Sequence, residues 1–344
     1  MDTIVVNHLS KTFRAKQKQP GVAGSIQALW KPNYTTVAAV DGVSFRIGRG
    51  EVVGFIGPNG AGKSTTLKML TGILHPTSGE ASVLGLTPWR ERQRLVFRIA
   101  SVFGQRSQLW YHLPPADSFR LLSHIYELDR RAYDQRLQRL VDLFAIAPYM
   151  HVPVRRLSLG ERMRCEIAAA LLHRPEVILL DEPTIGLDVV AKQQIRALVR
   201  TLAEEEAVTV LLTSHDAGDI EQVCSRVLVI NHGSLIFDDS LERLKGAFLR
   251  HKVIDLKLAE AAAPPAMTGV TVIEAGPFRL RLEVDTDREP MERVIGGLVS
   301  AYRIADLTIE EPPLDEVIAA IYAAGSRARS PAVVGDLTPS PSHV

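Results

Sequence analysis

A glycine-rich stretch that carries a lysine and a serine is the part of the chain best suited to chemistry. Residues 57–65 follow the spacing G-x-x-x-x-G-K-S of a phosphate-binding loop. Backbone N–H groups of such a loop surround phosphate oxygens, and the helix that follows adds unpaired donors at its start. Lys63 would bring a positive charge to the β- and γ-phosphates, and Ser64 a hydroxyl to Mg²⁺. The residues predicted to contact the nucleotide here are Gly57, Pro58, Asn59, Gly60, Ala61, Gly62, Lys63, Ser64 and Thr65.

The flanks of this loop support the prediction. Residues 52–56 form a short apolar run, and residues 66–70 place apolar side chains at helical spacing. A strand, a glycine loop and a helix in succession are the context in which the pattern binds phosphate. A glycine-rich turn with a chance Lys-Ser pair is the alternative, and these flanks disfavour it. The sequence therefore predicts binding of a nucleoside triphosphate.

Composition limits the class of protein. The 344 residues suffice for two domains and a tail, and the net charge of +1, from 40 basic and 39 acidic residues, indicates no nucleic-acid or anionic-membrane partner. No apolar run approaches the length of a membrane span, and residues 1–4 do not begin a signal peptide. Cys165 and Cys224 lack metal-ligand spacing, so we expect structural thiols in a reducing cytosol.

Apolar strands that alternate with helices predict a mostly parallel α/β sheet in the first 245 residues. A loop inserted over 14–36, with a short helix near 25–30, and helices alone over about 106–157 interrupt this pattern. Residues 250–325 begin a new alternation that predicts a small α+β domain, with its last helix over 314–324. Residues 326–344 are rich in proline and serine, which is typical of a disordered tail. A helix is also expected over 90–98.

Further motifs narrow the function. Gln105 ends a strand, residues 157–162 (Leu-Ser-Leu-Gly-Glu-Arg) open a helix, and residues 177–183 are an apolar run that ends in Asp-Glu-Pro. Gly-Leu-Asp follows at 186–188, and His215 follows a strand. At these residues the chain resembles the ATP-binding subunit of an ABC transporter over about residues 3–240. The resemblance is greatest to the NatA-like ATPases of the exporter branch, with Leu-Ser-Leu-Gly in place of the usual Leu-Ser-Gly-Gly.

The resemblance implies an α/β P-loop NTPase fold of ABC type, with a mostly parallel sheet, a β subdomain and a helical insert, followed by the small α+β domain. It also implies roles for individual residues. Asp181 would hold Mg²⁺ through water, together with Ser64 and Gln105, and Glu182 would polarise the water that attacks the γ-phosphate. His215 and Lys63 would contact that phosphate. A solvated Asp-Glu turn and an ordinary surface or core histidine are the alternatives.

The helix that starts near Ser158 carries a second predicted phosphate contact. In the family, Ser158, Gly160 and Glu161 would cap the ATP of the other subunit, with Asp188 also at the nucleotide, so that a homodimer closes around two ATP molecules. An ordinary serine N-cap with Glu161 in a capping box is compatible with this role. Glu161 replaces the common glutamine and brings a carboxylate near the γ-phosphate. For the adenine ring, Phe13 holds the matching position; Trp30 and Tyr34 are alternatives, as is a core role for Phe13.

The resulting hypothesis is an ATPase that powers a membrane exporter. ATP would join two copies of the chain, and the helical insert would transmit this to integral membrane permease subunits at the cytoplasmic face of the membrane. A soluble ATPase that acts on ribosomes or DNA is the main alternative, but the chain has one such domain and no basic face. A P-loop kinase or GTPase would not account for the Leu-Ser-Leu-Gly helix. The transported substrate is not encoded in these motifs, and a regulatory or dimer-bracing role of the small domain rests on analogy alone.

Overall fold

The computed structural model describes residues 2–16, 34–104, 107–248 and 251–310, and beyond these residues 314, 317, 318, 321 and 322. Several expectations lie outside this part of the chain: the short helix near 25–30, Trp30, Gln105 and the tail over 326–344. They stay predictions.

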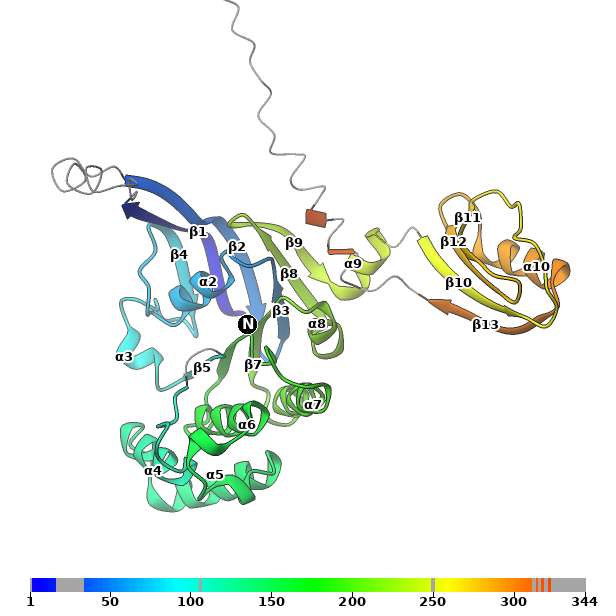
Figure 1. Cartoon of the computed structure of the whole chain (residues 1–344). Coiled ribbons are helices and arrows are strands. Elements are labelled where there is room, and N and C mark those ends of the chain that lie inside the picture. Colours follow the sequence, from blue (N-terminus) through cyan, green and yellow to red (C-terminus); the bar gives the residue numbers. More distant parts are fainter. Residues whose placement is uncertain are drawn as a thin grey trace, which may run out of the picture.

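The centre of the larger domain is a mostly parallel sheet (Figure 1). In the described chain its strands lie in the order β5-β6-β7-β3-β8-β9, and β9 runs antiparallel to β8. Their bounds are β3 (Val52–Ile56), β5 (Ile99–Phe103), β6 (Val177–Asp181), β7 (Thr209–Ser214), β8 (Arg226–Asn231) and β9 (Ser234–Ser240). This arrangement confirms the predicted α/β fold class.

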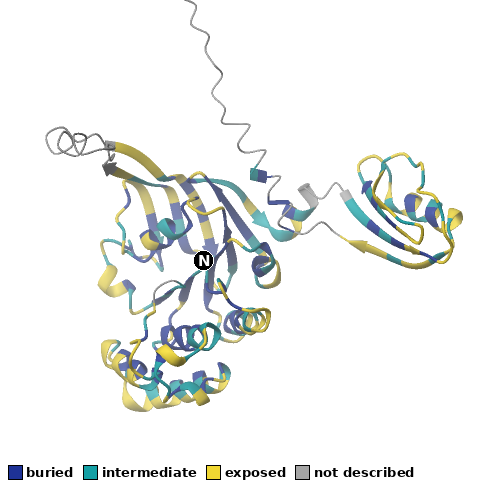
Figure 2. Ribbon diagram, viewed as in Figure 1, coloured by how far each residue is buried: buried dark blue, intermediate teal, exposed yellow. Residues whose placement is uncertain are grey.

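Successive side chains of β6 enter cores on opposite faces of the sheet, as the period of two in a strand requires. Ile178 and Leu180 pack with α6, α7 and α8. Val177 and Leu179 pack instead with α2 and with the antiparallel sheet of β1, β2 and β4. These helices are α2 (Lys63–Leu70), α6 (Leu159–Ala170), α7 (Val189–Glu206) and α8 (Ala217–Val223). Because both faces of the sheet are covered, its central strands β3, β6 and β7 are buried over almost their whole length (Figure 2).

An antiparallel sheet in the order β2-β1-β4 forms the expected β subdomain. Its strands are β1 (Asp2–Lys16), β2 (Tyr34–Gly48) and β4 (Ser78–Val83). The expectation of a loop over the whole of 14–36 is wrong at both ends, because Arg14 pairs with Thr36 and Lys16 with Tyr34. The hairpin continues there as strand, since its backbone groups pair across the two arms. The helix expected over 90–98 is also shorter, α3 (Arg92–Leu95).

The described part of the expected helical insert contains α4 (Pro115–Ile125) and α5 (Arg130–Leu143), followed by 3₁₀ turns at Ala147–Tyr149 and Val154–Arg156. Helix α5 begins after Asp129, whose carboxylate accepts from the backbone N–H groups of Arg131 and Ala132. Phe119 and Leu140 are fully buried and join the core that also contains α6. The insert therefore packs directly on the helix that starts at the Leu-Ser-Leu-Gly motif.

The small domain has a core of its own. Its antiparallel strands lie in the order β11-β12-β10-β13, and α10 covers one face through Val294 and Leu298. The elements are β10 (His251–Leu258), β11 (Val270–Ala275), β12 (Arg279–Asp285), α10 (Met291–Ala301) and β13 (Ile304–Glu310). The other face bears ion pairs such as Asp255–Arg279 and Lys257–Asp306, so it is solvated.

The segment after Glu310 departs from the expected boundary at 325. Its described residues Leu314, Val317, Ile318 and Ile321 are helical and buried, and they belong to the core of the larger domain together with Leu244 of α9 (Leu241–Phe248). Their spacing of three and four residues places them on one helix face. The chain therefore leaves the larger domain after α9, forms the small domain and returns.

Candidate nucleotide-binding site

A cavity of about 370 Å³ lies at the carboxyl ends of the parallel strands, where ligands bind in open α/β sheets. Its lining combines the glycine loop after β3 with the ends of β5 and β6. The lining residues are Pro58, Asn59, Gly60, Ala61, Gly62, Lys63, Ser64, Thr65, Lys68, Ile73, Phe103, Gly104, Asp181 and Glu182. The predicted loop and the predicted acidic pair thus meet in one place, although they are far apart in sequence.

Glycine is required at two points of the loop. A Cβ on Gly62 would lie 2.4 Å from the carbonyl oxygen of Ala39, and the residue has a φ of +112°. A Cβ on Gly57 would lie 2.5 Å from the carbonyl oxygen of Ile230. Helix α2 starts directly after Gly62 with no side-chain cap, so its first N–H groups are available to an anion.

Lys63 is buried, with 5% of its side chain exposed. Its Nζ donates to the carbonyl oxygens of Gly57 at 2.6 Å and Pro58 at 3.4 Å and lies 3.5 Å from Oε1 of Glu182. A buried ammonium needs such partners. The lysine is thereby held inside the loop, with its charge at the cavity.

Ser64 and Asp181 present adjacent oxygens. The Ser64 hydroxyl donates to Oδ1 of Asp181 at 3.1 Å, and the Thr213 hydroxyl donates to the same oxygen at 2.7 Å. A hydroxyl and a carboxylate are hard oxygen ligands of the kind Mg²⁺ prefers, and Mg²⁺ commonly keeps several waters beside one or two protein ligands. The donor set therefore fits Mg²⁺. Gln105, the third predicted ligand, lies outside the described residues.

Glu182 sits in a left-handed backbone conformation, with a φ of 53°. Its N–H donates to the hydroxyl of Thr213 at 3.0 Å, and its Oε2 lies 3.5 Å from Nδ1 of His215. Such backbone strain is often found where a side chain must be held for function. The carboxylate stands between Lys63 and His215, so the structure brings the three predicted catalytic residues together.

The capping box predicted at Ser158 is confirmed. The Ser158 N–H donates to Oε2 of Glu161 at 2.8 Å, and the Glu161 N–H donates to the Ser158 hydroxyl at 3.3 Å. The bond from the Ser158 backbone is the largest cause that lowers the pKa of Glu161. These residues do not line the cavity described above, and their role toward the ATP of a second copy stays a prediction.

Asp188 is the N-cap of the neighbouring helix α7 and does not line the cavity. Its carboxylate accepts from the N–H of Ala191 at 2.8 Å at the start of α7. A Cβ on Gly160 would lie 2.8 Å from the Cβ of Ala191. Gly160 thus allows the starts of α6 and α7 to approach closely, which places the Leu-Ser-Leu-Gly motif beside the helix start that Asp188 caps.

Phe13 is 41% exposed on β1, where it pairs with Val37. The core role weighed for it is therefore wrong. Nζ of Lys11 lies 5.4 Å from the centroid of its ring, a cation–π contact. Phe13 is not among the residues that line the cavity, so contact with adenine stays a prediction.

Asp219 of α8 is a supporting residue that the sequence analysis missed. This buried carboxylate accepts from the hydroxyls of Thr184 and Ser214 and from the guanidinium of Arg196. Thr184 follows Glu182 by two residues, and Ser214 precedes His215. Asp219 therefore ties together the turns that carry both. Because its partners Thr184 and Arg196 lie on other segments of the chain, no local sequence pattern marked Asp219.

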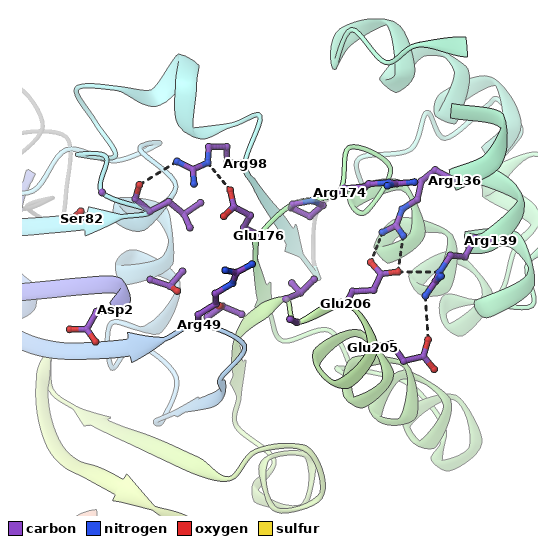
Figure 3. A pocket seen from close by; sticks show the side chains of 17 residues that line it. Asp2, Arg49, Ser82, Arg98, Arg136, Arg139, Arg174, Glu176, Glu205 and Glu206 are labelled. Carbon is purple, nitrogen blue, oxygen red and sulfur yellow. Dashed lines mark hydrogen bonds and ion pairs between the residues drawn. The ribbon is translucent and has the colours of Figure 1, made fainter. Parts of the chain in front are cut away.

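A larger cavity of about 670 Å³ lies at the amino ends of the parallel strands (Figure 3). Its arginines face glutamates: Arg136 donates to both oxygens of Glu206 at 2.7 and 2.8 Å, and Arg98 donates to Glu176 at 2.7 Å. Arg136 also donates to the carbonyl of Leu171, at the end of α6. Arginine at helix carboxyl ends offsets the negative end of the dipole. These contacts account for the charges of Arg98 and Arg136 without a ligand.

The loop, the parallel sheet and the acidic strand end define a P-loop NTPase. The family described as "ABC transporter" matches residues 40–185. Similar proteins include the ABC transporter ATP-binding protein NatA of Bacillus subtilis (strain 168), 35% identical over 208 residues, 60% of this chain and 84% of NatA. The daunorubicin resistance ATP-binding protein DrrA3 of Streptomyces coeruleorubidus is 34% identical over 292 residues, 83% of this chain and 91% of DrrA3.

Solved structures agree. A dimeric, post-hydrolysis structure of an ATP-binding cassette bound to ADP and Pi has a TM-score of 0.58 and 25% identity, and the match covers 69% of this chain and 98% of that one. The chain belongs to the ATP-binding subunits of ABC transporters, an ATPase family. No helix in its described part is long and apolar enough to cross a membrane.

Proposed function

We propose that this chain binds and hydrolyses ATP with Mg²⁺ and so powers a membrane exporter. The observation that carries the proposal is that Lys63 and Glu182 meet at one cavity, with His215 next to Glu182. The glycine loop and Lys63 bind the β- and γ-phosphates, and Ser64 and Asp181 hold the metal ion. Bound Mg²⁺ offsets the negative charge of the phosphates. Glu182 orients the attacking water and accepts its proton, while His215 steadies the γ-phosphate.

A second copy of the chain completes the site in this proposal. The starts of α6 and α7 lie side by side but away from the cavity of their own chain. Helix starts attract anions, so they suit the ATP held by a partner copy. The dimeric cassette among the similar structures supports this arrangement. ATP then joins two copies, and hydrolysis lets them part.

Transport itself requires integral membrane permease subunits, which we place on the helical insert. Large apolar side chains are exposed there: Trp110, Tyr111, Leu113, Leu121 and Ile125. Exposed apolar groups of this kind suit a protein partner. The chain would then act at the cytoplasmic face of the membrane. Export, rather than import, is supported by the resistance protein among its relatives.

Co-purification tests the proposal. A tagged Glu182→Gln chain, expressed in its native host, is isolated from gently solubilised membranes with ATP and Mg²⁺, and the partner chains are identified by mass spectrometry. We expect a stoichiometric membrane protein with several spans. A Lys63→Ala chain, as a control, should retain less of it. Ribosomal proteins or DNA-repair factors without a membrane protein would contradict the transport role but leave the ATPase intact.

A further inference from the structure

Glu166 is a buried carboxylate in the middle of α6, with 3% of its surface exposed. Burial raises its pKa, and hydrogen bonds from Ser107 and Gln108 counteract this shift more strongly than the charge of Arg162 does. A buried ionisable group is unfavourable unless polar partners satisfy it. An apolar side chain would pack α6 without this penalty. Packing alone therefore does not account for the carboxylate.

The partners of Glu166 belong to one short segment. The Ser107 hydroxyl donates to Oε1, and the Gln108 N–H donates to Oε2 at 2.8 Å. The side-chain amide of Gln108 in turn donates to the backbone carbonyl of Ser101 in β5. The carboxylate thus connects α6 with the start of the helical insert, and Gln108 carries the connection on to the sheet.

Ser107 and Gln108 follow closely, in sequence, two residues that line the nucleotide cavity. Phe103 and Gly104 line the cavity, and the Gly104 N–H donates to the carbonyl of Asp181 at 2.9 Å. Two residues separate Gly104 from Ser107. Helix α6, on which Glu166 lies, starts at the capping box of Ser158. Glu166 therefore stands between the cavity of its own chain and the helix start that faces outward.

We propose that Glu166 is a positioning residue for ATP hydrolysis, which ties the chain after Gly104 to α6. The inference rests on the proposed function, because it assigns Glu166 a part in that reaction. With the tie intact, a shift of the end of β5, which lies beside Asp181, also moves α6. Without the tie, the P-loop still binds nucleotide, but Ser107 and Gln108 lose their fixed place against α6, close in sequence to the residues that line the cavity. Loss of placement lowers the rate of chemistry more than it lowers affinity.

The test compares Glu166→Leu with Glu166→Gln. Leucine fills the space but accepts no hydrogen bond, whereas glutamine can accept from the Gln108 N–H and donate to the Ser107 hydroxyl. We expect Glu166→Leu to lower kcat about tenfold with a nucleotide Kd within twofold of the wild type. Glu166→Gln should restore most of kcat. Hydrogen exchange of the 107–109 amides should rise in the leucine variant only.

A matched control separates positioning from stability. Leu140→Ala opens a cavity in the same core and should lower Tm without a change in kcat well below Tm. Ser107→Ala, which removes one partner hydroxyl, should lower kcat about twofold, and should add nothing in the Glu166→Leu background. A kcat of Glu166→Leu equal to that of the wild type overturns the inference, as does unchanged amide exchange. Absence of wild-type hydrolysis would instead refute the proposed function, and amide exchange would still decide whether the tie exists.

Discussion

Nζ of Lys63 lies 3.5 Å from Oε1 of Glu182, so the cation proposed to bind the γ-phosphate adjoins the carboxylate proposed to activate water. Lys63 enters from the loop after β3, and Glu182 from the end of β6. Strand β7 lies between β3 and β6 and supplies Thr213, which holds both Asp181 and Glu182. The order of strands in the sheet, rather than the order of residues in the chain, creates this contact.

Lys63→Ala should weaken ATP binding. A hydrogen bond to a charged group contributes about 1.5–3 kcal/mol, so we expect Kd to rise roughly 10- to 100-fold. Titration calorimetry with ATP and Mg²⁺ measures this. Lys257→Ala, which removes the same charge from an exposed ion pair in the small domain, is the control. Equal affinities of the two variants would contradict the assignment.

Glu182→Gln should keep nucleotide affinity and lose hydrolysis. General-base assistance contributes about 10²–10⁴ in rate, and an amide cannot accept the proton from water. Phosphate release, measured with saturating ATP and Mg²⁺, should fall by that factor. His215→Ala should produce a smaller loss, because its contact with Glu182 is secondary to the proton transfer. Wild-type turnover in Glu182→Gln would refute the catalytic role.

Glu161→Gln should strengthen ATP-driven association of two copies. Its lowered pKa keeps the carboxylate ionised at the start of α6, where it would repel a γ-phosphate from the partner. Glutamine retains an acceptor for the Ser158 N–H, although the helix loses about 0.3–1 kcal/mol of favourable charge–dipole energy. Sedimentation in a Glu182→Gln background should show a lower dimer Kd with ATP. A weaker dimer would mean that Glu161 takes part in the contact.

Arg136 and Glu206 should stabilise the larger domain in a pH-dependent way. The hydrogen bond from Arg136 is the largest cause that lowers the pKa of Glu206, so the stabilisation is complete above the ordinary carboxyl pKa and is lost as pH falls through the lowered value. Arg136→Ala leaves Glu206 with only its longer contact to Nε of Arg139, at 3.4 Å, and should cost about 1.5–3 kcal/mol at neutral pH. Urea unfolding should show this deficit shrinking in acid. An exposed pair, tested by Arg303→Ala, should cost about 0–1 kcal/mol.

Ile318→Ala should destabilise the larger domain, although Ile318 lies after the small domain in sequence. The side chain is buried in the core that contains Leu244 and α7, and such a truncation costs about 2–5 kcal/mol. Thermal unfolding of the full chain, followed with and without ATP, should show a lower Tm for the transition that ATP raises. If only the Tm of the transition that ATP does not raise were lowered, Ile318 would belong to the small domain instead.

Local patterns in the sequence determined much of this protein. The apolar runs of β6 and β7, the glycine loop at 57–65 and the capping box at Ser158 were predicted correctly, because each depends on interactions among close neighbours or on burial of a whole strand. The same patterns, with the resemblance they carry, identified the family. Alternation also predicted the small sheet, whose strands β10 and β12 bury every second residue.

Tertiary structure decided what depends on contacts between distant segments. Three features join residues that are distant in sequence, and the sequence around each residue gives no local signal of its partner. They are the network of Asp219, the tie from Glu166 to Ser107, and the packing of Leu314 and Ile318 in the core of the larger domain. The adjacency of Lys63 and Glu182 followed from strand order. Sequence periodicity reports which face of an element is buried; it does not report which other element covers that face, and the packing of the whole chain settles that.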